Sequence, residues 1–141
     1  MRSGLRYWYI WLSVGFGLVA LVIYLSVAGF YMPQAPFKIG DKLNHLLAYG
    51  VLMGWFGQLF LRWRHRYFIA IALVLLGVSM EFVQGTMAHR TFEWLDAGAN
   101  SLGVVIAIVA LAFGAEKILR KFEVLALSNK QLFKKFLRST S

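Results

Sequence analysis

The chain has 141 residues, of which 60% are apolar and 15% charged, with 15 lysines and arginines against six acidic residues. This apolar fraction is well above that of soluble domains and excludes a soluble enzyme, a coiled coil and a disordered tail. The chain has no cysteine, which excludes a disulfide framework, a thiolate zinc site and a cysteine nucleophile. The apolar residues gather into four long runs, so we expect a small integral membrane protein.

The first apolar run extends over residues 7–32 and contains no charged residue. The apolar core of a secretory signal has only about 7–15 residues, so this run is predicted to be an uncleaved membrane helix. Three further spans, each long enough to cross the hydrocarbon core, are predicted at 44–61, 67–83 and 95–115. The predicted fold class is all-α, an integral membrane four-helix bundle that occupies residues 1–115.

The last part of the chain, residues 116–141, has a different composition. Seven lysines and arginines alternate there with large apolar side chains. This pattern is typical of a basic amphipathic helix that lies on an anionic membrane surface. We therefore expect a basic interfacial tail on the cytoplasmic side, with membrane lipids as its partners.

The basic residues are divided unequally between the two predicted sides of the membrane. Twelve of them lie at the N-terminus, in the 62–66 connection and in the tail, whereas three lie in the other two connections. Positively charged segments stay in the cytoplasm, so both chain ends are predicted to be cytoplasmic and connections 33–44 and 84–94 to face outward. The charge thus sets orientation, and since no nucleic-acid-binding motif accompanies it we expect no nucleic-acid partner.

Most of the unusual polar residues lie in or beside the two outward connections. Helical spacing aligns them into one stripe on each of three spans. Polar groups are expensive to expose to lipid, so the three stripes are expected to face one another and to form a ligand pocket open to the exterior. The predicted pocket residues are Asp41, Lys42, His45, Tyr49, Glu81, Gln84, Arg90, Asp96 and Asn100.

Three of these residues, His45, Glu81 and Asp96, are candidates for catalysis, because an imidazole beside carboxylates can transfer protons. The same residue types also form metal sites. The HExxH spacing of zinc proteases is absent, however, and we predict neither a metal nor a cofactor. Lys42 and Arg90 suit the binding of a phosphate or carboxylate group.

A purely structural role is the alternative for the same residues. Asp41 and Asp96 each open a span, where a carboxylate can cap free backbone N–H groups. Glu81 is the only acidic residue within the third span, and Arg90 follows nine residues later. A buried carboxylate needs a cation, so these two side chains are expected to form an ion pair.

Four short segments, in this order, resemble the VanZ-like family. They are DKLNHLLAY at 41–49, EFVQ at 81–84, RTFEWLD at 90–96 and ANSLG at 99–103. The loop between Gln84 and Arg90 departs from the family, whose members often have an aromatic residue and a proline there. The resemblance implies a multi-pass protein of the bacterial cytoplasmic (inner) membrane, in a family named for a protein associated with teicoplanin resistance. It implies no established catalytic residue.

On this basis we expect a VanZ-like protein of the cell envelope that binds or shields an envelope component or a glycopeptide in its outer pocket. One alternative is a membrane-embedded enzyme that acts on a lipid-linked envelope precursor, with His45 and Glu81 as acid and base. A second alternative is a small transporter subunit. It would assemble as a homo-oligomer, because four helices enclose little volume. Whether a reaction is catalysed stays open between these functions.

Overall fold

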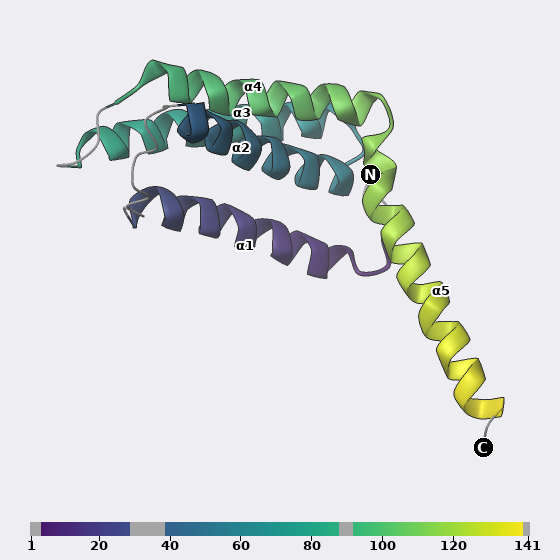
Figure 1. Ribbon diagram of the computed structural model, residues 1–141. Coiled ribbons are helices and arrows are strands. Elements are labelled where there is room, and N and C mark those ends of the chain that lie inside the picture. Colours follow the sequence, from purple (N-terminus) through teal and green to yellow (C-terminus); the bar gives the residue numbers. More distant parts are fainter. Residues whose placement is uncertain (1–3, 29–38, 88–91, 140–141) are drawn as a thin grey trace.

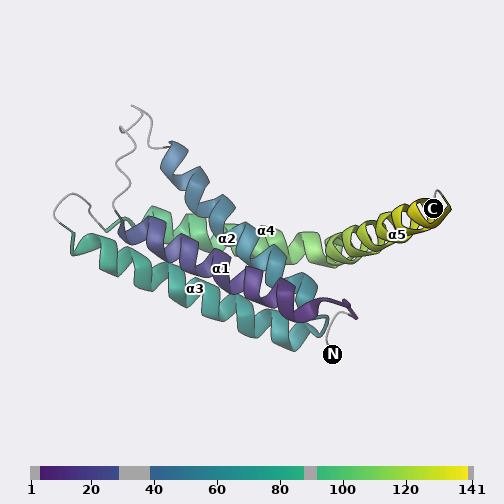
Figure 2. The same ribbon diagram turned by 90° about the horizontal axis from the view of Figure 1, so that it is seen from below.

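The computed structural model describes residues 4–28, 39–87 and 92–139, with the side chains of the last helix described as far as Ser128. Its helices, in chain order, are α1 (Trp8–Val27), α2 (Ile39–Leu59), α3 (Trp63–Gly85), α4 (Trp94–Ala112), the short 3-10 helix η1 (Ala115–Lys117) and α5 (Ile118–Ser139). Helices α1 to α4 lie side by side, and α5 turns away from them at one end (Figure 1). Helix α1 packs on α2 and α3 from one side and α4 packs on the same pair from the other (Figure 2).

The helix bounds differ from the predicted spans in a regular way. Helix α2 begins five residues before the predicted 44–61 span, and α3 begins four residues before the predicted 67–83 span. Polar and basic residues continue each helix beyond its apolar run, because backbone hydrogen bonding does not stop where hydropathy falls. Helix α4 ends three residues before 115, where Gly114 adopts the left-handed conformation that terminates helices. Residues 29–32 of the first predicted span lie outside the described residues.

Three helices, α1, α3 and α4, are long and apolar enough to cross a membrane by length and composition. Large apolar side chains on their outer faces are exposed, among them Phe16 of α1 and Phe68 of α3. A soluble fold would cover such side chains, whereas lipid solvates them. Helix α2 has 21 residues but carries several polar residues in its first turns, which lower its mean hydropathy. The prediction of an all-helical fold is confirmed for the described residues, and three of their helices are long and apolar enough to cross a membrane.

The backbones of helices α2 and α4 come into contact at two glycines. A Cβ atom added to Gly50 would lie 3.3 Å from the carbonyl oxygen of Gly103. A Cβ added to Gly103 would collide with the backbone oxygen of Leu46. Small residues at a helix crossing allow the two backbones to come into contact, as they often do in membrane proteins. This crossing also brings the polar first turns of α2 and α4 together.

We predict that Gly103→Ala lowers the free energy of unfolding by about 1–3 kcal/mol, because the added methyl group forces the two backbones apart. Gly98→Ala, in the same helix, is the matched control, since a Cβ there meets no atom within 4 Å. Thermal unfolding of both variants in detergent measures the difference. Equal melting temperatures for the two variants would contradict a close crossing at Gly103.

At the opposite end of the bundle, the first turns of α5 are fixed to α1. The carboxylate of Glu123 accepts hydrogen bonds from the backbone N–H groups of Arg6 at 2.8 Å and Tyr7 at 3.0 Å. It also accepts one from Nε1 of Trp11 at 3.0 Å. The N-terminus of a helix has unpaired N–H groups and a partial positive charge, and Tyr7 supplies no side-chain cap. Glu123 therefore acts as the cap of α1 from a distant part of the chain.

Arg66 holds the same end of the bundle together. Its side chain is 1% exposed, and Nε donates to the carbonyl oxygens of Gly57 and Phe60, each at 3.0 Å. Nη2 forms an ion pair with Glu116 at 2.6 Å. From the sequence, the basic residues of 62–66 were expected only to set the orientation of the chain in the membrane. This interpretation was incomplete for Arg66, because its charge is buried and paired within the fold.

The environment of Glu123 gives its contribution a defined pH dependence. Burial raises the pKa of this carboxyl, but the hydrogen bonds from Trp11, Tyr7 and Arg6 and the charge of Arg6 outweigh burial and lower the pKa below 4.5. A carboxyl with a lowered pKa stabilises the fold at neutral pH and loses that effect as the pH falls through its folded-state value.

We therefore expect Glu123→Gln to lower the free energy of unfolding at pH 7 by about 1.5–3 kcal/mol, the usual range for hydrogen bonds to a charged group. The difference from the unmodified protein should shrink as the pH falls below 4.5. Thermal unfolding between neutral and acid pH measures it, with Lys121→Gln, an exposed change in the same helix, as control. A difference that stays constant with pH would show that the charge of Glu123 is not what holds α1.

Candidate functional site

A group of polar side chains lies at the end of the bundle opposite α5. It is formed where α2 and α4 begin and α3 ends, at the same end of the bundle (Figure 1). We call this group the polar site. Its members are Asp41, Lys42, His45, Glu81, Glu93, Asp96 and Asn100.

Lys42 links α2 to the start of α4. Its ammonium group donates to Asp96 Oδ1 at 2.9 Å and to Glu93 Oε2 at 3.0 Å. The Asp96 side chain is 9% exposed, whereas those of Lys42 and Glu93 are close to 30% exposed. Two carboxylates already neutralise this ammonium, so the structure gives less support to Lys42 as the receptor of an anionic ligand.

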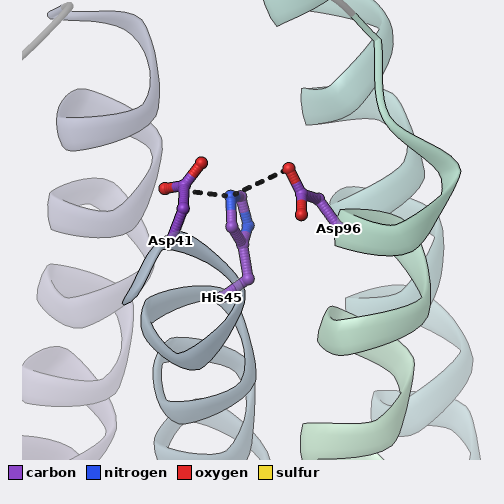
Figure 3. A group of neighbouring side chains, drawn as sticks. All are labelled: Asp41, His45 and Asp96. Atoms are coloured by element: carbon purple, nitrogen blue, oxygen red, sulfur yellow. Dashed lines mark ion pairs between the residues drawn. The ribbon is translucent and has the colours of Figure 1, made fainter. Parts of the chain in front are cut away.

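His45 lies between residues of all three helices. Its Nδ1 is 3.1 Å from Asn100 Oδ1, and because an amide oxygen can only accept, Nδ1 is the donor. Its Nε2 is 3.9 Å from Asp41 Oδ1 and 4.0 Å from Asp96 Oδ2 (Figure 3). Both distances are too long for hydrogen bonds.

Glu81 approaches the other side of the imidazole. Its Oε1 is 3.7 Å from His45 Nδ1, and its side chain is 2% exposed. Three carboxylates, those of Asp41, Glu81 and Asp96, therefore come within 4 Å of one ring. The structure brings the three candidate catalytic residues together, each from a different helix.

The capping role considered for the two aspartates does not hold for Asp96. The residue before α4 is Glu93, no side chain caps this helix, and Asp96 lies in its first turn. The carboxylate of Asp96 points to Lys42 and His45 instead. Asp41 lies in the first turn of α2 with half of its side chain exposed.

Tyr49 and Asn100 are buried next to His45, and both contact Gly77 of α3. A Cβ at Gly77 would lie 3.0 Å from Asn100 Nδ2 and 3.3 Å from Tyr49 Cε1. Neither the Tyr49 hydroxyl nor Asn100 Nδ2 has a hydrogen-bond partner within the described part of the chain. The glycine thus lets α3 close the floor of the polar site.

Of the other predicted pocket residues, Gln84 contacts α1, and Arg90 is not among the described residues. Gln84 donates from Nε2 to the carbonyl oxygen of Ser26 at 3.1 Å and so ties α3 to α1. Arg90 lies in 88–91, outside the described residues, and its pairing with Glu81 stays a prediction. Conversely, the sequence analysis did not assign Glu93 to the pocket. Its position could have been predicted from spacing, because Glu93 precedes Asp96 by three residues, close to one helical turn.

Comparison with known proteins adds little to this geometry. No family model matches the chain, and no solved structure matches it. An uncharacterized protein of the fission yeast Schizosaccharomyces pombe is 31% identical to it over 98 residues, which cover 65% of this chain and 60% of that protein. The chain therefore spans less than two thirds of the length of this relative.

The predicted membership of the VanZ-like family is wrong on these findings. No family model supports it, and a eukaryotic relative points away from a bacterial family. The four segments that carried the resemblance are short sets of polar residues at helical spacing. Any membrane bundle that gathers its polar residues into one cluster needs similar spacing, so the pattern alone does not define a family. The bacterial inner membrane, the cell envelope and teicoplanin resistance lose their support with it.

Proposed function

We propose that α1 to α4 all cross the membrane as a four-helix bundle, with both chain ends in the cytoplasm. Helix α2 packs between three apolar helices, and its buried residues, such as Leu52 and Met53, belong to the same core as those of α4. The distribution of 12 basic residues against three supports this orientation. Helix α5 then lies at the cytoplasmic surface, where Phe122 and Leu125 are exposed beside basic residues.

Reporter fusions test this topology. Fusions after Arg64 and after Arg138 should report the cytoplasm, and fusions near Gly40 and Ala88 should report the opposite side. If α2 did not cross the membrane, the fusions near Gly40 and after Arg64 would report the same side. That outcome would exclude the four-span arrangement and leave three crossing helices.

We further propose that the protein is a membrane-embedded binding protein whose polar site holds a positively charged group. The observation that carries this proposal is the excess of carboxylates around His45 and Lys42. Four acidic residues, Asp41, Glu81, Glu93 and Asp96, form the site. They outnumber the basic residues of the two outward connections, which are Lys38, Lys42 and Arg90. Lys38 and Arg90 lie outside the described residues.

The location of these carboxylates strengthens the argument. Glu81 and Asp96 are nearly inaccessible to solvent, and a charge removed from water is stable only when an opposite charge or hydrogen bonds compensate it. Lys42 compensates Asp96 and Glu93, whereas His45 lies within 4 Å of three carboxylates. The four carboxylates of the site would attract a cation or an amine-bearing head group. Asp41, half exposed, gives such a group access from the membrane surface.

Thermal unfolding of the full chain in detergent tests the charge of the ligand. Phosphoethanolamine and glycerol phosphate form a matched pair, because both carry a phosphate and only the former carries an ammonium group. We expect phosphoethanolamine and ethanolamine to raise the melting temperature, since a ligand stabilises the state that binds it. Glycerol phosphate should have no effect, and His45→Ala should weaken the response to the amines. Stabilisation by glycerol phosphate alone would contradict the proposal and favour anion binding.

A second candidate function is a membrane enzyme with His45 as acid or base, which the surrounding carboxylates favour. Incubation of the protein with a membrane lipid extract, followed by mass spectrometry, separates the two functions. A binding protein retains lipid unchanged, whereas an enzyme converts it. Glycopeptides and envelope precursors were expected only from the family resemblance, and no contact in the site favours them.

A further inference from the structure

We infer that Asp41, His45 and Asp96 bind a divalent first-row transition metal ion, of which Zn²⁺ is the representative. This inference rests on the proposed cation-binding function of the polar site and names the cation. It departs from the sequence analysis, which predicted no metal. The spacing of the three residues along the chain matches no metal motif, and only the fold brings them together.

The three side chains offer converging donor atoms. One donor atom from each residue lies within 4.8 Å of the other two. In Figure 3 both carboxylates flank the imidazole, with Nε2 at 3.9 Å from Asp41 and 4.0 Å from Asp96. Bonds of about 2.0–2.1 Å to a tetrahedral Zn²⁺ separate neighbouring donor atoms by about 3.3 Å. Metal binding therefore requires the donor atoms to move closer together by no more than about 1.5 Å. Rotation of the half-exposed Asp41 side chain supplies part of this movement.

The surrounding contacts orient the donors toward a common point. Asn100 accepts the Nδ1 proton of His45, so Nε2 is the ring nitrogen that faces the two aspartates. Lys42 occupies Oδ1 of Asp96 and leaves Oδ2 on the side of His45. A histidine that donates its second ring N–H, and a carboxylate that is itself hydrogen-bonded, are regular features around metal ligands.

The separations within the group do not match direct hydrogen bonds between the imidazole and the two aspartates. Charge-assisted hydrogen bonds have lengths of about 2.7–2.9 Å. The observed separations of 3.9 and 4.0 Å are closer to the distance of about 3.3 Å between neighbouring donor atoms of a tetrahedral Zn²⁺. The mixture of one nitrogen and two oxygen donors favours zinc, manganese or iron, because calcium and magnesium take oxygen ligands. Three protein ligands leave a fourth position for an exogenous ligand.

Metal titration of the full chain in detergent, after removal of bound ions with EDTA, tests the inference. We expect one equivalent of Zn²⁺ by mass-spectrometric metal analysis and a rise in melting temperature with Zn²⁺ concentration. Co²⁺ should produce a visible absorption band typical of nitrogen and oxygen ligation. Ca²⁺ and Mg²⁺ should not compete at equal concentration.

Variants assign the binding to the three residues. Asp41→Asn and His45→Gln should each weaken Zn²⁺ binding at least about tenfold, as loss of a ligand should cost no less than loss of an outer partner. His65→Gln is the matched control, because it makes the same histidine-to-glutamine change in the first turn of α3, outside the polar site. It should keep the affinity within about threefold. Asp41 is half exposed, so its replacement should leave the fold intact and report on the metal alone.

The outcomes separate this inference from the proposed function. Zn²⁺ binding that is absent at millimolar concentration, or that is equal in the unmodified protein and Asp41→Asn, would overturn the metal site. If ethanolamine still stabilises the protein in that case, the site is a cation site of another kind and the proposed function stands. If neither Zn²⁺ nor ethanolamine stabilises the protein, both proposals fail.

Discussion

The crossing of α2 and α4 at Gly50 and Gly103 is the contact on which the polar site depends. The short interactions that join the starts of these helices are those of Lys42 with Asp96 and Glu93 and of His45 with Asn100, and they lie on the N-terminal side of this crossing along α2 and α4. Backbone contact at the glycines fixes how far apart the two helix starts lie. A wider crossing would leave buried carboxylates without partners, which is the costliest arrangement in an apolar environment.

The two ends of the bundle solve the problem of buried charge in different ways. At the end near α5, each buried charge has close partners, as in the pairing of Arg66 with Glu116 and the capping of α1 by Glu123. At the other end, Lys42 pairs closely with Asp96 and Glu93, and the carboxylates of Asp41, Glu81 and Asp96 all lie 3.7–4.0 Å from the ring of His45. Several like charges that converge on one titratable ring are characteristic of functional sites. This contrast is the reason for assigning function to the α2–α4 end.

The sequence predicted the helices and the faces of their polar stripes, because apolar length and helical periodicity depend on local residues alone. It therefore anticipated that His45, Glu81 and Asp96 would approach one another. It did not anticipate the capping of α1 by Glu123, more than a hundred residues away, or the burial of Arg66. Periodicity shows which residues share a face of a helix, but not which neighbouring helix that face will contact. The sequence therefore placed Gln84 in the pocket, whereas its side chain contacts α1. The family resemblance failed for a related reason, since polar residues at helical spacing follow from the cost of exposing them to lipid.

The graded exposure within the site suggests how a ligand would reach it. Asp41 is half exposed, His45 is 12% exposed and Asn100, directly below, is 1% exposed. A charged group approaching from the surface would meet the Asp41 carboxylate first, while still hydrated, and could exchange water for protein ligands one at a time. Desolvation is then compensated at each step, which lowers the barrier to entry for a strongly hydrated ion. The buried floor of Asn100 and Tyr49 sets the depth at which such a ligand stops, because below it α2, α3 and α4 close into apolar contacts.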